Sequence, residues 1–110
     1  MAYFPFFIDI EGKNGLVVGG GKIALHKLQK LLPYGAKLRV VAPEVLEELE
    51  QTALRNDIDV IKRRFCSSDL INMSFVIAAS DNAELNMEIS RLCGEKGILR
   101  RRKYRGISAR

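Results

Sequence analysis

Three consecutive glycines at positions 19–21 constrain the fold of this 110-residue chain more than any other feature. They separate a short β-branched run, "GLVV", from the stretch "KIALHKLQKLL", whose apolar residues recur at helical spacing. The spacing Gly19-x-Gly21-x-x-Ala24 fits a tight strand-to-helix turn, with small residues where backbone must approach a phosphate. Because the following helix offers free N–H groups, the stretch predicts a pyrophosphate-binding turn. The alternative is a tight βα turn without a ligand.

The remainder of the chain alternates apolar runs with amphipathic stretches. Further strands are predicted at residues 36–43, 58–63 and 73–80, and helices at 43–56 and 81–97. The segment "SSDLIN" predicts one short helical turn. Because strands joined by helices form parallel sheets, the chain is predicted to be α/β: a single domain with a Rossmann-like parallel sheet and helices on both faces.

Helix-end signals add detail to this outline. Pro43 is predicted to lie in the first turn of the second helix, from which Leu46 should face inward. Asp81 and Glu84 have the spacing of a capping box for the third long helix.

The basic charge is concentrated at one end of the chain. The net charge is +5, yet residues 100–110 hold six basic residues and no acid, which leaves the remainder at −1. Burying an unpaired cation costs several kcal/mol. We therefore expect a dinucleotide-binding domain over residues 1–99, and a basic tail over 100–110 outside the sheet. Nucleic acid is not an expected partner of the body, and a polybasic arm for nucleic acid or anionic lipid is the alternative role of the tail.

Glu44 stands near the position where the fingerprint expects an acid for the ribose hydroxyls, about 20 residues after the glycines. It could reach the ribose, or it could lie in the first helical turn and favour the helix dipole. No Arg or Lys directly follows this strand to hold a 2′-phosphate. NAD is therefore expected in preference to NADP.

Other classes of protein find little support. No apolar run approaches the roughly 18 residues that span a membrane, and the N-terminus lacks the basic region of a signal peptide. We expect a cytoplasmic protein with no membrane partner, whose cysteines, Cys66 and Cys93, are buried free thiols. The lone His26 has no partner at metal-ligand spacing, so no metal site is expected.

The strings "VVGGGKIALHK", "LLPYGAKLRVVAP" and "FVIAASDNAELNMEIS" together resemble the precorrin-2 dehydrogenase and sirohydrochlorin ferrochelatase family. That family includes the N-terminal NAD-binding module of siroheme synthases. The resemblance implies an NAD-dependent oxidoreductase of siroheme (porphyrin) biosynthesis, which oxidises the tetrapyrrole precorrin-2 to sirohydrochlorin; some members also insert iron. A non-catalytic, NAD-binding regulatory module is the alternative.

The resemblance also implies positions for the cofactor. The residues expected against the pyrophosphate are Gly19, Gly20, Gly21, Lys22 and Ile23. Pro43 and Glu44, next to Ala42, would lie by the adenosine ribose, and Ala79 and Ser80 would border the nicotinamide. For Ser80 and Asp81, capping of the third long helix is the alternative role.

One stretch departs from the family pattern. The family continues with a strand of the type "I-x-x-N-V-V-D", whose aspartate is its candidate catalytic group, whereas Lys103 stands at that position here. A lysine ammonium has no lone pair with which to accept a proton or bind iron. The resemblance therefore implies NAD binding, assigns no catalytic residue and leaves activity open. The family forms homodimers through a segment that this chain lacks. A truncated or frame-shifted end is our hypothesis for residues 100–110.

Overall fold

The structure is a computed structural model that describes residues 8–102. Its elements alternate between strands and helices, with two short 3₁₀ turns, η1 and η2. In chain order they are β1 (Asn14–Val18), α1 (Lys22–Leu31), η1 (Leu32–Tyr34), β2 (Lys37–Val41), α2 (Glu47–Arg55), β3 (Asp59–Ile61), η2 (Ser67–Leu70), β4 (Phe75–Ala78), α3 (Ala83–Lys96) and β5 (Leu99–Arg102).

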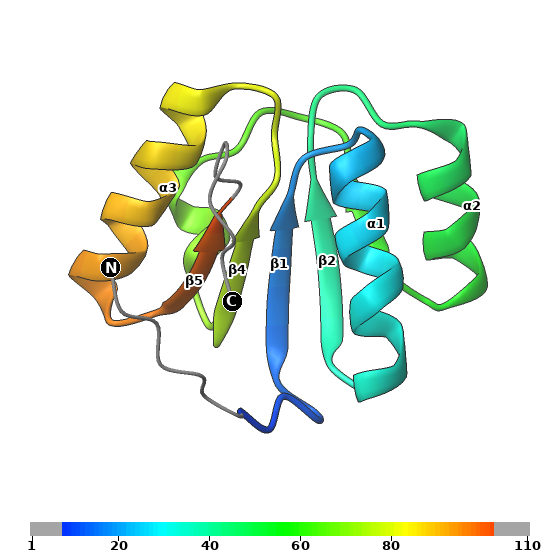
Figure 1. The fold of residues 1–110 in the computed structure, drawn as a ribbon, viewed down its shortest axis with the longest axis horizontal. Helices are drawn as coiled ribbons and strands as arrows, with labels where there is room; N and C mark the ends of the chain where they lie inside the picture. Colours follow the sequence, from blue (N-terminus) through cyan, green and yellow to red (C-terminus); the bar gives the residue numbers. More distant parts are fainter. Residues whose placement is uncertain (1–7, 103–110) are drawn as a thin grey trace, which may run out of the picture.

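The strands form one parallel sheet in the order β3-β2-β1-β4-β5 (Figure 1). The chain first moves outward from β1 through β2 to β3, and then crosses back to β4 on the other side of β1. Val17 on β1 is in register with Val40 on β2 and Ile77 on β4. The change of direction beside β1 creates the crevice in which open α/β sheets bind ligands, at the carboxyl ends of the strands.

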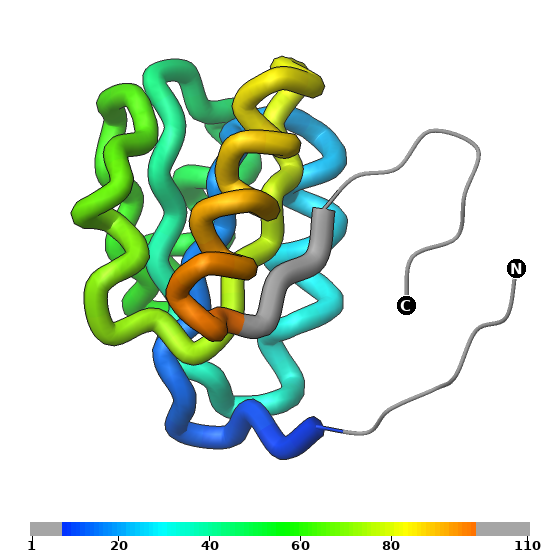
Figure 2. The backbone as a smooth tube through the Cα atoms, turned by 90° about the vertical axis from the view of Figure 1, so that its left-hand side faces the viewer, coloured from blue at the N-terminus to red at the C-terminus, as the bar shows by residue number. Residues whose placement is uncertain are grey.

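Side chains of the central strands alternate between two cores, one on each face of the sheet. On the first face, Val17 and Val40 pack with buried residues of α1 and α2 such as Leu28 and Leu49. On the second face, Val18 packs with buried residues of η2 and α3; the members of this second cluster are Leu16, Val18, Val41, Leu70, Val76, Ala78, Ile89 and Cys93. Figure 2 shows α1 and the η2 segment on opposite sides of the strands. The predicted Rossmann-like sheet with helices on both faces is confirmed.

Two predicted helix starts are wrong. The second helix begins at Glu47, so Pro43 and Glu44 precede it in an irregular loop, and Leu46 is 39% exposed instead of facing inward. The cause is a hydrogen bond from the Leu46 N–H to the Gly20 carbonyl at 2.8 Å, which holds this loop beside the glycine turn. For α3, the cap is Asn82, whose side chain accepts a hydrogen bond from the Leu85 N–H, and not a box of Asp81 and Glu84.

The prediction that the chain leaves the sheet after residue 99 is also wrong. Residues 100–102 belong to β5, which pairs with β4 from Leu99 opposite Phe75 to Arg102 opposite Ala78. Within the described chain β5 is an edge strand, and charged residues are common on edge strands because they discourage pairing of the open edge with a further strand. Residues 103–110, and with them Lys103 and the rest of the expected tail, lie outside the described residues.

The two cysteines differ from each other. Cys93 is buried, as predicted, whereas Cys66 is exposed, and neither forms a disulfide within the described residues. Within residues 8–102, no helix combines the length and the apolar character needed to cross a bilayer.

Candidate functional site

A cleft of about 770 Å³ opens at the carboxyl ends of the strands. Four loops build its walls, one after each of β1, β2, β3 and β4, and Leu85 of α3 adds to them. The lining residues include Gly19, Gly20, Gly21, Ala42, Pro43, Glu44, Arg64, Phe65, Ser80 and Asp81. The cleft therefore brings together seven of the ten predicted cofactor-binding residues: the three glycines, Ala42, Pro43, Glu44 and Ser80.

The first two glycines of the turn are required by the protein's own packing. Gly19 has a φ of +141°, a conformation that side chains disfavour, and a Cβ there would overlap the carbonyl oxygen of Ala79. A Cβ on Gly20 would overlap the carbonyl oxygen of Glu44. These two positions would therefore need glycine even in a protein that binds nothing at this turn.

Gly21 is different because the described protein atoms leave open the space that a side chain would take. The nearest heavy atom to a Cβ built there is Asp81 Oδ2, at 3.9 Å, and its φ of −95° is open to other residues. Gly21 is also the N-cap of α1, and as a glycine it offers no side chain to cap the N–H groups of the first turn. The structure thus leaves space and donors at the same point, and an anion from outside the chain fits both.

The next two predicted residues, Lys22 and Ile23, form the first turn of α1 and are not among the residues that line the cleft. Lys22 is exposed, and Ile23 packs partly against the α1 and α2 core. A cation in the first turn opposes the helix dipole, so Lys22 adds positive charge where the helix is already positive.

Glu44 lies in the second wall of the cleft, with Ala42 and Pro43 before it. Because α2 begins only at Glu47, the alternative that Glu44 lies in a first helical turn is wrong. Its side chain is exposed at the cleft. The carboxylate is thus in a position to accept hydrogen bonds from a bound polyol.

Ser80 lies at the rim of the cleft and is held by Asn86, a residue that the sequence analysis did not single out. The Asn86 Oδ1 accepts from the Ser80 N–H at 3.2 Å and from its hydroxyl at 2.8 Å, and the Asn86 amide donates to the Ser80 carbonyl at 3.0 Å. Asn86 is only 4% exposed. A polar residue on the same helical face as Ile89 and Cys93 was the signal that could have found it.

The remaining predicted contact, Ala79, is buried and lies behind the cleft rather than in its lining. Its carbonyl oxygen is the atom against which the Gly19 turn packs. For Ser80, the capping alternative receives partial support: its hydroxyl accepts from the Asn82 N–H at 3.2 Å, although Asn82 is the cap itself.

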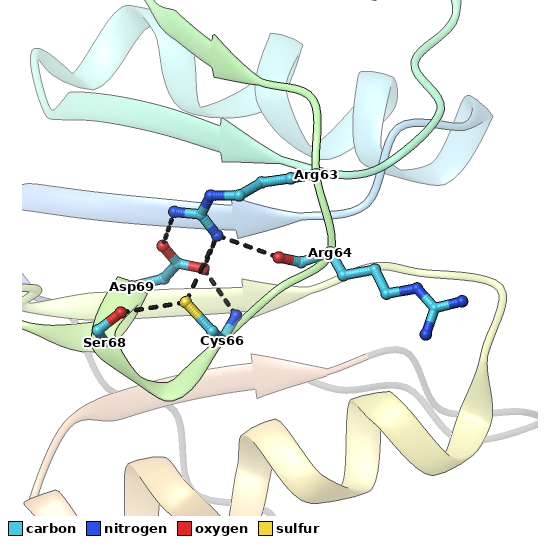
Figure 3. Close-up of polar contacts among 5 residues, drawn as sticks. All are labelled: Arg63, Arg64, Cys66, Ser68 and Asp69. Atoms are coloured by element: carbon cyan, nitrogen blue, oxygen red, sulfur yellow. Dashed lines mark hydrogen bonds and ion pairs between the residues drawn. The ribbon is translucent and has the colours of Figure 1, made fainter.

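The loop after β3 forms the third wall, and a clamp between Arg63 and Asp69 fixes it (Figure 3). The guanidinium donates to both carboxylate oxygens, at 2.9 and 2.6 Å, and also to the Arg64 carbonyl at 3.0 Å. The Cys66 N–H donates to Asp69 Oδ2 at 2.9 Å. The hydrogen bond from Arg63 is the main cause that holds the pKa of the buried Asp69 carboxyl below its usual range, and the bond from the Cys66 N–H adds to it. The bond to Asp69 in turn raises the pKa of Arg63.

Metal binding has no visible basis in the part of the chain that the structure describes. There, no three His, Cys, Asp or Glu side chains are grouped so as to hold an ion. His26 is exposed on α1.

The chain is similar to known proteins in sequence and in fold. Residues 6–102 match the model of a family described as putative NAD(P)-binding. A siroheme synthase of Chromobacterium violaceum is 38% identical over 99 residues, which cover 90% of this chain and 21% of the relative. The siroheme synthase of Pseudomonas entomophila is 47% identical over 90 residues, or 82% of this chain and 19% of the relative.

A solved structure with the same fold is SirC, a precorrin-2 dehydrogenase. It superposes with a TM-score of 0.76 at 24% sequence identity, covering 97% of this chain and 51% of SirC. The chain thus spans about a fifth of the length of the siroheme synthases that it matches.

Proposed function

Since this chain belongs to the family of putative NAD(P)-binding domains, we propose that its cleft binds a nicotinamide dinucleotide, with NAD as the cofactor. The observation that carries the proposal is Gly21. Of the three glycines in the turn, it is the one whose missing side chain the protein does not fill. Because Gly21 has no Cβ, a pyrophosphate bound there could approach the backbone more closely than beside any other residue.

Electrostatics at the start of α1 support the same ligand. The N–H groups of the first turn of a helix carry partial positive charge and bind phosphate oxygens. In the first turn of α1 there is no acidic residue, and Lys22 adds a full positive charge. An anion at this point would satisfy the free donors and offset the unfavourable position of Lys22.

The arrangement of the loops supports one orientation of the dinucleotide. The loops after β2 and β4 lie on opposite sides of the glycine turn because β1 lies between these two strands. The adenosine half would extend toward Glu44, whose carboxylate would accept hydrogen bonds from the ribose hydroxyls. The nicotinamide half would extend toward Ser80, which Asn86 holds in place. Bound NAD would supply a hydride acceptor, and the chain's own residues would position it.

We further propose that the domain serves the oxidation of precorrin-2 to sirohydrochlorin in the siroheme pathway. The proposal draws on the siroheme synthase relatives, whose length this chain covers only in part. Lys103 at the expected position of a carboxylate favours a second candidate, a regulatory module that binds NAD without turnover. An assay of precorrin-2 oxidation with NAD⁺ separates the two: binding without turnover would support the regulatory module.

Titration of the chain with NAD⁺ by isothermal calorimetry tests the binding proposal, using the variant Gly21→Ala. The added methyl has room in the unliganded protein, since its nearest neighbour would be 3.9 Å away. We expect the free energy of unfolding to change by less than about 1 kcal/mol, because the lower entropy of the unfolded chain favours the variant whereas alanine is a poorer N-cap than glycine. The affinity for NAD⁺ should fall about tenfold or more, because the methyl takes the space of the pyrophosphate.

Gly94→Ala is the matched control, because it makes the same change at an exposed position near the end of α3. It should leave NAD⁺ affinity unchanged. No binding of NAD⁺ or NADP⁺ by the unsubstituted chain would refute the proposed function. Equal affinities of Gly21→Ala and the unsubstituted chain would refute the role of the glycine turn.

A further inference from the structure

Arg64 places a positive charge at the cleft, whereas the residues that follow β2 supply none. The residue is exposed and lines the cleft together with Glu44 and the glycine turn. Among the described residues its guanidinium makes no hydrogen bond or ion pair, and the one bond of Arg64 is accepted by its backbone carbonyl. A positive charge at a cleft wall without a partner in the protein is available to an anionic ligand.

The clamp between Arg63 and Asp69 holds the backbone from which the Arg64 side chain extends. On one side, the Arg63 side chain turns inward to Asp69 and also binds the Arg64 carbonyl; on the other side, the Cys66 N–H is bound to Asp69. Figure 3 shows the Arg64 side chain extending away from this cluster. The backbone on both sides of Arg64 is thus tied to a single buried carboxylate, so the guanidinium starts from a fixed base.

The sheet order indicates which part of a dinucleotide Arg64 can reach. A pyrophosphate at the glycine turn lies at the end of β1, and Glu44 follows the neighbouring β2. Arg64 follows β3, one strand further from β1 on the same side. An anion that meets Arg64 would therefore be attached to the adenosine end, beyond the ribose position at Glu44.

We propose that Arg64 binds the 2′-phosphate of NADP, so that this cleft accepts NADP as well as NAD. This inference rests on the proposed dinucleotide function. An arginine near the ribose provides two parallel N–H donors for a phosphate. Glu44 acts in the opposite direction, because its charge favours the free 2′-hydroxyl and repels the phosphate. Arg64 offsets that repulsion, which the residues after β2 alone would leave uncompensated.

The test is calorimetric titration of NAD⁺ and NADP⁺ into the unsubstituted chain and into Arg64→Gln. Because the side chain makes no bond within the described protein, the variant should keep its unfolding midpoint. We expect Arg64→Gln to weaken NADP⁺ about tenfold or more and NAD⁺ by less than about threefold. Arg55→Gln, the same change at an exposed position at the end of α2, should alter neither affinity.

Glu44→Gln should shift the preference the other way, with tighter binding of NADP⁺ relative to NAD⁺. Equal losses for both nucleotides in Arg64→Gln would overturn the inference, since the guanidinium would then act on adenine or pyrophosphate. Unchanged NADP⁺ affinity in that variant, or an unsubstituted chain that binds NAD⁺ and not NADP⁺, would also overturn it while leaving the proposed function intact. If the unsubstituted chain binds neither nucleotide, both proposals fail.

Discussion

Gly20 shows how closely the glycine turn and the loop before α2 approach each other. A methyl on Gly20 would overlap the Glu44 carbonyl oxygen, so Gly20→Ala must push the two segments apart. We expect a loss of about 1–3 kcal/mol in the free energy of unfolding, the usual cost of overpacking. Urea unfolding followed by circular dichroism measures it.

Gly21→Ala is the comparison for Gly20→Ala, because it adds the same methyl one residue further along the turn. An unchanged urea midpoint for Gly20→Ala would show that the loop yields without cost, and would contradict this packing argument.

The spacing of the glycines predicted the turn correctly, but it could not separate the reasons for each residue. A Gly19-x-Gly21-x-x-Ala24 pattern is the same whether a glycine avoids a ligand or a carbonyl of its own chain. The clash at Gly20 arises from Glu44, which lies well along the sequence and contacts the turn only after folding. Arg64 escaped prediction for the same reason, because its place in the cleft depends on β3 lying beside β2.

At the scale of elements, the start of α3 depends on Asn86. Asn86→Ala removes three hydrogen bonds to Ser80 and leaves the half-buried N–H and carbonyl of Ser80 without these partners. We expect a loss of about 1–3 kcal/mol in the free energy of unfolding. A lower affinity for NAD⁺ should accompany it, because Ser80 would no longer be fixed at the rim of the cleft. Chemical unfolding and calorimetric titration measure the two effects.

Met87→Ala is a control for the same helix, because Met87 is 62% exposed and points to solvent. It should change neither quantity measurably. Wild-type stability in Asn86→Ala would mean that water replaces the lost hydrogen bonds, and the positioning role would then be wrong.

The predicted elements were correct in order and type, and their ends were the weak point. Continuous apolar runs predicted β1 and β4, because each of these strands buries both of its faces. The start of α2 was wrong because the Leu46 N–H bonds to Gly20, a contact between loops that local sequence does not encode. Four consecutive cations argued against a strand after residue 99. This prediction failed because β5 pairs with β4 at the edge of the described sheet, where charged residues are common.

For the molecule as a whole, the Arg63 and Asp69 clamp predicts part of the pH dependence of stability. The pKa of Asp69 is lower in the folded protein than its ordinary value, so its stabilising contribution is complete above that value. The contribution is lost as the pH falls from about 5 through the lower, folded pKa. Glu88, whose pKa Arg91 also lowers, acts in the same direction.

Asp69→Asn isolates this contribution. At pH 7 the variant should lose about 1–3 kcal/mol, because a neutral amide replaces the buried carboxylate that accepts hydrogen bonds from Arg63 and the Cys66 N–H. The difference between the two proteins should shrink as the pH is lowered from 5 to 3, measured by urea unfolding at each pH. A difference that stays constant over this range would exclude Asp69 as the titrating group.

The 2.8 Å hydrogen bond between the Leu46 N–H and the Gly20 carbonyl has a consequence for protein engineering. The glycine turn and the loop of residues 44–46 pack against each other, and each is shaped by the backbone of the other. One way to change cofactor preference would be to replace the segment after β2, which carries Glu44, with that of another protein. In this scaffold such a graft would succeed only if the donor segment kept the course of residues 44–46, or if both loops were exchanged as a pair.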